Sequence, residues 1–132
     1  MAVPILKQGP YLIASSQAAL TDTDVLQLRD DVMGQVTRHR SRGIIVDVTA
    51  LDVMDSFVSR SLRSIAMMTR LRGAQTVIVG IQPEVAFAMV QLGLTLKGIA
   101  TALDLEEGLA FLDRQGHGRI DNRPGHGRID RG

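Results

Sequence analysis

The run IIVDV at 44–48 constrains the fold of this chain most strongly. It is rich in β-branched side chains, a pattern typical of a strand that is buried on both faces. From Ser56 onward the apolar period changes, because Val58, Leu62 and Ile65 recur at the spacing of a helix. A buried strand followed by a short loop and an amphipathic helix predicts an α/β fold.

The rest of the chain repeats this alternation. We expect strands at 3–6, 11–14, 44–48, 76–79 and 98–101, and helices from 21–24 to 39–43 and at 56–71, 84–92 and 104–112. Gln8-Gly9-Pro10 indicates a turn between the first two strands, and Gly43 is expected to follow the end of the first helix. The predicted fold class is therefore α/β, a single domain with a mixed, mostly parallel sheet, an N-terminal hairpin and packed helices.

The composition narrows the classes of partner. A chain of 132 residues with a net charge of +1 has no overall charge that would attract nucleic acid or acidic lipid. Aromatic residues make up 3% and tryptophan is absent, so nucleic-acid binding by base stacking is not expected. The absence of cysteine fits a cytoplasmic protein. We see no signal peptide or membrane-spanning run and expect no contact with a membrane.

The C-terminal segment has a different character. The hexapeptide GHGRID occurs twice, at 116–121 and 125–130, in a stretch with few apolar residues. Such a segment can bury too little apolar surface to offset the entropy lost on ordering. We therefore divide the chain into a domain at 1–115 and a flexible Gly/Arg-rich repeat tail at 116–132. The tail is either a solubilising extension or a weak RNA contact.

The expected helix at 84–92 is apolar nearly all round. Val85, Phe87 and Met89 are among its apolar residues. A domain of this size cannot cover every face of such a helix with its own sheet. We therefore expect Val85, Phe87 and Met89 to contact another protein chain during assembly.

Ser56 is the main candidate for a functional residue. It stands where the central strand leads into a helix, and either Asp55 or Ser56 can cap that helix. The positively polarised helix end suits an anion, including a phosphate attached to the serine. The alternative is that Ser56 serves only as a cap.

The other polar residues offer weaker candidates. Asp52 and Asp55 could form a carboxylate pair or bind a metal, but no third ligand is supplied, and a solvated acidic loop is the simpler interpretation. His39 and the tail residues His117 and His126 are poorly placed to act as a base for Ser56. Phosphate-binding glycine motifs are missing as well. We expect no cofactor, no metal and no catalytic residue.

At this point two motifs together resemble a known family. The first is the run at 44–48 leading into Asp55-Ser56-Phe57, and the second is Gly-Ile-Gln-Pro-Glu-Val-Ala at 80–86. The chain resembles a STAS domain, the fold of anti-sigma-factor antagonists, and is similar to the stressosome scaffold branch of that family. The resemblance covers roughly residues 3 to 113 and leaves out the repetitive tail.

The resemblance implies a non-enzymatic phosphoprotein in stress-response signalling by partner switching. It implies that an RsbT-like serine kinase of the GHKL ATPase type phosphorylates Ser56 and is released, and that a phosphatase removes the phosphate. It also implies RsbR-like STAS paralogues and self-association in a large assembly. We expect the kinase to contact the residues around the switch, which are Asp55, Phe57, Ser59, Arg60 and Arg63.

Two rival functions remain open. One is a simple anti-anti-sigma factor that binds an anti-sigma kinase one to one. The other is a small α/β hydrolase or ligand-binding domain that uses Asp52, Asp55 and Ser56.

Overall fold

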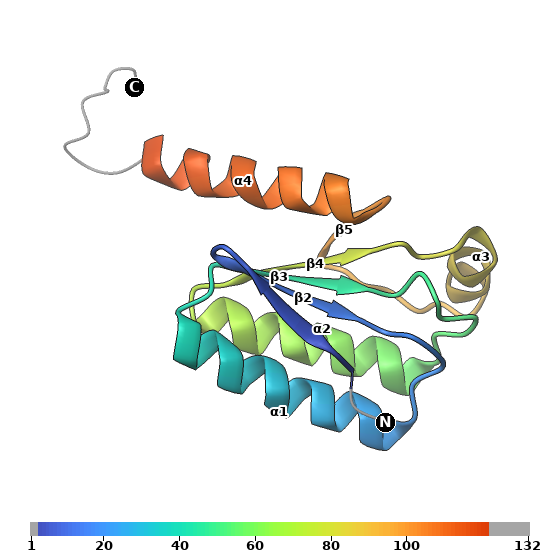
Figure 1. Cartoon of the computed structure of the whole chain (residues 1–132). Coiled ribbons are helices and arrows are strands. Elements are labelled where there is room, and N and C mark those ends of the chain that lie inside the picture. The colour runs from blue at the N-terminus through green and yellow to red at the C-terminus, as the bar shows by residue number, and fades with distance from the viewer. Residues whose placement is uncertain (1–2, 122–132) are drawn as a thin grey trace.

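A five-stranded sheet forms the centre of the computed structural model, which describes residues 3–121 and the side chains of 3–116 (Figure 1). The strand order is β1-β2-β3-β4-β5, with β1 and β2 antiparallel and the remaining pairs parallel. The strands are β1 Ile5–Gln8, β2 Tyr11–Ser15, β3 Gly43–Asp47, β4 Gln75–Val79 and β5 Ala100–Ala102. The helices are α1 Asp22–His39, α2 Ser56–Leu71, α3 Pro83–Gln91 and α4 Leu105–Asp121. The predicted fold class is confirmed.

The central strand β3 is buried on both faces, as its sequence predicts. Ile44 and Val46 belong to the apolar core on one face, and Ile45 belongs to the core on the other face. Helices α1 and α2 cover the first face and α4 covers the second (Figure 1). Alternate residues of a strand point to opposite faces, so a strand covered on both sides needs apolar residues at every position.

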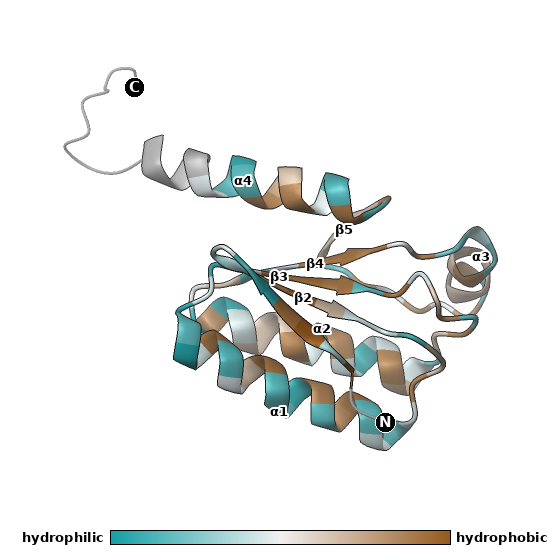
Figure 2. Cartoon of the chain, in the orientation of Figure 1, coloured by the Kyte–Doolittle hydropathy of each residue, from teal (hydrophilic) through white to brown (hydrophobic). Residues whose placement is uncertain are grey.

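The larger core lies between the sheet and the pair α1 and α2. Each helix contributes one apolar stripe, with Leu28 and Val32 on α1 and Leu62 and Ile65 on α2, and all four are almost fully buried. Burial of each such side chain contributes about 1.5–3 kcal/mol. Figure 2 shows the result, with hydrophobic central strands and a largely hydrophilic outer surface on α1.

Helix α4 packs unusually close to the sheet, and this corrects one prediction. Gly43 does not follow the end of α1 but begins β3, and a Cβ there would lie 2.8 Å from Leu112 of α4. A Cβ at Gly108 of α4 would likewise lie 2.8 Å from Val79. The residue that ends α1 is Arg40, in the left-handed conformation at φ 50°. The two glycines are therefore needed for close helix-to-sheet contact.

The last helix is longer than its sequence predicts. We expected it to end near 112 and a flexible tail to begin at 116, whereas α4 continues to Asp121 and includes the first GHGRID repeat. Adding residues to a helix whose earlier turns pack on the sheet avoids the cost of nucleation, which explains how a glycine-rich run can continue it. The remainder of the predicted tail, 122–132, lies outside the described residues.

Candidate functional site

The loop between β3 and α2 is held by apolar anchors. Val48, Leu51 and Met54 are each at most 3% exposed, whereas the intervening Asp52 and Val53 face solvent. The loop thus alternates between side chains inserted into the core and side chains left outside. This pattern fixes the backbone that delivers the chain to the first turn of α2.

Ser56 is the first residue of α2 and is exposed. The helix is capped by Asp55, whose Oδ1 accepts a hydrogen bond from the backbone N–H of Val58 at 2.8 Å. Of the two capping alternatives, Asp55 is therefore the one realised. No hydrogen bond to the Ser56 hydroxyl occurs within the part of the chain described, so this hydroxyl is free at a positively polarised helix end.

The two sequence motifs meet in space beside this loop. The Asp47 carboxylate accepts hydrogen bonds from the Thr49 backbone N–H at 2.9 Å and from the Thr49 hydroxyl at 2.6 Å. Gln82, from the second motif, donates its side-chain N–H to the Thr49 carbonyl. Gly80 has φ 82°, and a Cβ there would lie 2.0 Å from the Thr49 hydroxyl oxygen. Only glycine satisfies both the backbone conformation and the contact.

The residues expected around the switch lie in different environments. Phe57 is half-buried against the core, and Arg60 is exposed. Both line an open groove of about 290 Å³ between α1 and α2, which Leu26 and Arg29 border from α1. Arg63 is half-buried, and its guanidinium donates to the Thr95 carbonyl at 3.1 Å. Arg60 is thus available to a partner, while Arg63 ties α2 to the segment that follows α3.

The prediction that Ser59 contacts a partner is wrong. Its exposed fraction is 0%, and its hydroxyl has no hydrogen-bond partner in the described structure. The reason is the helical period: Ser59 lies on the same side of α2 as Leu62 and Ala66, which face the sheet. Ser56 is therefore exposed and Ser59 is buried, although only two residues lie between them in the sequence.

The buried and exposed side chains of α3 also differ from the prediction. Val85 and Met89 are 4% and 6% exposed and belong to the core, so they cannot contact another chain as expected. They lie four residues apart on the side of α3 that faces the domain. The apolar surface left outside consists of Phe87, Val90 and Leu92, each at least 66% exposed. Of the three predicted assembly residues, only Phe87 is on the surface.

The acidic side chains beside Ser56 do not form a metal-binding group in the described structure. Among the described residues, no group of three or more His, Cys, Asp or Glu side chains is placed to hold a metal ion. Asp52 and Ser56 are both exposed, and the Asp55 carboxylate is occupied by its capping hydrogen bond. No described helix is both long enough and apolar enough to cross a membrane. The chemistry that the geometry supports is modification of an exposed hydroxyl.

Sequence reasoning missed the residues that hold the site. The contacts of Thr49 with Asp47, Gly80 and Gln82 join two strand ends that are far apart in the chain. The usable signal was Gly80 directly after a buried strand, since a glycine there often marks a close approach of another part of the backbone.

The fold and the comparison with known families define the class of protein. The STAS domain matches this chain over residues 3–108, and the chain belongs to the STAS domain family. Among solved structures it is similar to a serine-to-glutamate variant of RsbS from Moorella thermoacetica. The two are 36% identical with a TM-score of 0.75, over 87% of this chain and 97% of that one.

Two further proteins are similar to this chain. A chain of the stressosome, described as a signal integration and transduction hub, is 36% identical with a TM-score of 0.67, over 86% of this chain and 98% of that one. The RsbT co-antagonist protein RsbRA of Bacillus subtilis (strain 168) is 30% identical over 110 residues, which make up 83% of this chain. The match covers 40% of RsbRA, so the chain spans less than half the length of that relative.

Proposed function

We propose that this chain is a stressosome scaffold that sequesters an RsbT-like serine kinase and releases it when Ser56 is phosphorylated. In this proposal the chain is not itself an enzyme. It acts in the cytoplasm, where the kinase has ATP, and a phosphatase restores the unmodified state. The similarity to RsbS and to a stressosome chain over most of their lengths supports this assignment.

The observation that carries the proposal is the free hydroxyl of Ser56. It is exposed, it stands on the first turn of a well-anchored helix, and the capping role belongs to Asp55. A kinase can therefore reach it without opening the fold. Ser59, on the same helix, is fully buried and offers no such access.

A phosphate on Ser56 would change binding more than folding. It adds about −1.5 to −2 charges near neutral pH. The N-terminus of α2 stabilises such a charge by only about 0.3–1 kcal/mol, and the nearby carboxylates of Asp52 and Asp55 oppose it. A partner that desolvates this surface meets an unpaired charge, for which a loss of about 3 kcal/mol, roughly a hundredfold in affinity, is reasonable.

Assembly with RsbR-like paralogues and with further copies needs an exposed apolar surface. The exposed Phe87 and Val90 of α3, together with the exposed Leu92 that follows the helix, supply apolar area that the domain does not cover. Exposed apolar patches of this kind often mark protein contacts. We assign this surface to assembly. A particle much larger than a one-to-one complex should then form with the paralogue, whereas a simple antagonist would give only the small complex.

Incubation with the cognate kinase and ATP, followed by mass spectrometry, tests the site. We expect one phosphate on Ser56 and none on the Ser56→Ala variant. Ser64→Ala is the matched control, because Ser64 is an exposed serine on the same helix and should leave phosphorylation unchanged. A phosphate elsewhere, with Ser56 unmodified, would contradict the proposal.

Kinase binding tests the switch. Ser56→Asp should keep the fold and weaken kinase binding strongly, up to about a hundredfold for the full phosphate charge. Titration calorimetry measures the affinity, and circular dichroism checks the fold. Ser56→Asn is the control, because it is close in size to aspartate but carries no charge. If Ser56→Asp binds the kinase as tightly as the native chain, phosphorylation does not release it.

A further inference from the structure

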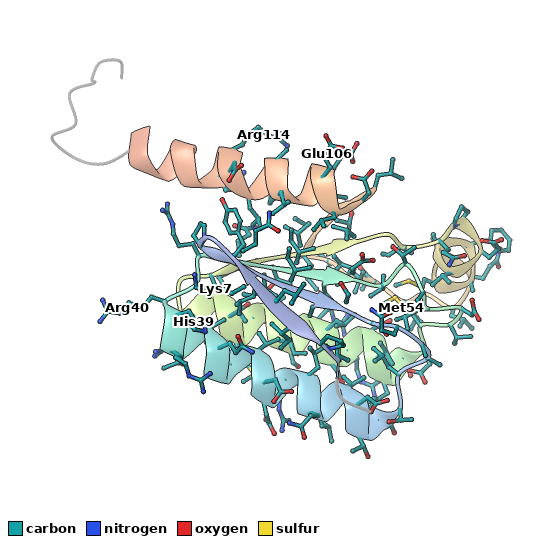
Figure 3. The ribbon with its side chains drawn as sticks, viewed as in Figure 1. Lys7, His39, Arg40, Met54, Glu106 and Arg114 are labelled. Atoms are coloured by element: carbon teal, nitrogen blue, oxygen red, sulfur yellow. The ribbon has the colours of Figure 1, made fainter. Side chains whose placement is uncertain are left out.

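Basic side chains gather at the end of the molecule opposite Ser56. Arg40 and Arg72 are exposed and line an open groove of about 490 Å³ beside the C-terminal ends of α1 and α2. With Lys7 and Arg42, which are also exposed, they form the basic end of the domain. Figure 3 shows Lys7 and Arg40 at this end, and Met54 of the switch loop at the other. The net charge of the chain is only +1, so the two ends differ by a separation of charge that the composition does not reveal.

Segments that are far apart in the chain meet at this end. The backbone N–H of Arg42 donates to the carbonyl of Pro10, in the turn between β1 and β2, at 2.7 Å. The Arg42 carbonyl accepts from the N–H of Gln75 at 3.1 Å. A Cβ at Gly116 of α4 would lie 3.2 Å from a guanidinium nitrogen of Arg42, so this side chain lies against α4. The turn after β1, the ends of α1 and α2 and the later part of α4 therefore lie together at the basic end (Figure 1).

The domain does not neutralise the charges of the basic end. None of its four cations forms an ion pair with another residue in the part of the chain that the structure describes. Acidic side chains occupy the first turns of α1, α3 and α4, at the other end of the molecule, and these are Asp22, Asp24, Glu84, Glu106 and Glu107. Asp113 lies closer, and its carboxylate accepts a hydrogen bond from the Tyr11 hydroxyl. The four cations are therefore available to an anionic partner.

Helix ends explain only part of this pattern. Arg38 and Arg70 lie in the last turns of α1 and α2, where the helix dipole stabilises a cation. Arg40 and Arg72 come after those turns. Arg40 has φ 50°, in the left-handed region, which is costly for a residue with a Cβ, and glycine is usual at this point of a helix end. The backbone therefore does not favour arginine at this position, which points to a use for its side chain.

The lining of the groove decides what kind of anion it suits. Its other lining residues are Thr37, Ser41, Gly73 and Val36, and Val36 is only 2% exposed. The groove thus presents no exposed apolar side chain against which a peptide side chain could pack, and no aromatic ring on which a base could stack. It offers separate cations on a fixed backbone, which suits a partner whose negative charges are spread along a chain.

We infer that the basic end binds the phosphate backbone of a nucleic acid and does not read its bases. A guanidinium can hold a phosphate with two parallel hydrogen bonds, and contacts to phosphate position a nucleic acid without carrying sequence information. The low aromatic content excludes base stacking, but a net charge near zero does not exclude a local concentration of cations. The contact needs neither the kinase nor Ser56, so this inference and the proposed function can fail separately.

The first test measures affinity and its dependence on salt. In fluorescence anisotropy, a labelled DNA duplex of about 20 base pairs should bind at low salt, and four phosphate contacts predict a slope of log K against log salt of about −3 to −4. Arg40→Gln with Arg72→Gln should weaken binding about tenfold and make that slope shallower by about two. Arg29→Gln with Arg114→Gln is the matched control, because it removes the same charge from residues that line two other grooves. The inference is overturned if the native chain does not bind, or if both double variants lose affinity equally.

The second test separates the domain from the C-terminal segment. Arg123, Arg128 and Arg131 lie outside the described residues. The tail variant, Arg123→Gln with Arg128→Gln and Arg131→Gln, should keep most of the binding that Arg40→Gln with Arg72→Gln loses. If the tail variant abolishes binding and the groove variant does not, the tail is the site and the inference is wrong. Arg40→Lys with Arg72→Lys keeps the charges and should bind more tightly than the glutamine variant, whereas equal weakness would mean that charge is not what is recognised.

Two rival partners are an acidic lipid surface and an acidic peptide. Leu71, beside Arg72, is 87% exposed, and a lipid surface would use such a side chain. Vesicles that contain phosphatidylserine, and polyglutamate, should each bind more weakly than the duplex at equal concentrations of negative charge, and tighter binding of either would overturn the inference. Phosphorylation of Ser56 in Arg40→Gln with Arg72→Gln should equal that of the native chain, because the groove lies at the opposite end. A kinase that modifies neither chain would count against the proposed function and leave the nucleic-acid contact intact.

Discussion

The two ends of the sheet are built by different means. At the end that carries Ser56, the loop before α2 is anchored by buried Val48, Leu51 and Met54, and Thr49 contacts Gly80 closely. At the other end the chain passes through short turns lined by exposed arginines, and a Cβ at Gly73 would meet no atom within 4 Å. One end is held by packing, and the other presents charge on open turns.

This difference suits two kinds of recognition. A phosphorylation switch works best when the backbone beneath it stays fixed, since the added charge then changes binding and not the fold. A surface that attracts a partner through charge needs no such anchoring, because long side chains can adjust to the partner. Substitutions at the anchored end and the open end test this contrast, in order of decreasing effect on the free energy of unfolding.

The largest effect is expected from Gly80→Ala compared with Gly73→Ala. Both glycines have positive φ, at 82° and 85°, so both variants bear conformational strain of about 1–2 kcal/mol. At Gly80 the new Cβ also meets Thr49, which adds about 1–3 kcal/mol of overpacking. Urea unfolding should therefore show a greater loss for Gly80→Ala. Equal losses would mean that the contact with Thr49 is not tight.

A medium effect is expected from Asp55→Ala. Removal of the cap of α2 should lower the free energy of unfolding by about 1 kcal/mol, within a range of about 0.5–2. Asp55→Asn should stay near the native value, because asparagine caps a helix about as well. Asp52→Ala is the matched control in the same loop, since Asp52 is exposed and caps nothing. A loss at Asp52 as large as that at Asp55 would contradict the capping role.

The smallest effect has the opposite sign. Ser59→Ala should raise the free energy of unfolding by about 1 kcal/mol, because it removes a buried hydroxyl that lacks a hydrogen-bond partner. Ser56→Ala should change stability little, since its hydroxyl is exposed and free. Thermal unfolding of the two variants side by side measures this difference. A destabilised Ser59→Ala would show that the hydroxyl finds a partner in solution.

Much of the fold could be predicted because local patterns carry it. The β-branched run at 44–48, the apolar stripe of α2 and the turn at Gly9 are each read from neighbouring residues, and the structure confirms them. The errors fall where distant parts meet. Gly43 was assigned to a helix end, although its role is to admit Leu112, which comes from the other end of the chain.

For the candidate site, too, the local features could be predicted and the contacts between distant segments could not. The position of Ser56 at a strand outlet and a helix start could be predicted, since both signals are local. Which nearby side chains reach solvent could not. Ser59 and Met89 looked available in the sequence, but the rotation of each helix against the sheet places them inside.

The sequence by itself determined the order of strands and helices, the serine at the start of α2 and the family to which the chain belongs. Tertiary structure alone decided which glycines are needed for close contact, which half of α3 remains outside, and how the charges separate between the two ends. The physical reason is the separation along the chain over which each effect acts. Periodicity and capping act between residues a few positions apart, whereas burial and charge separation depend on which distant segments pack together.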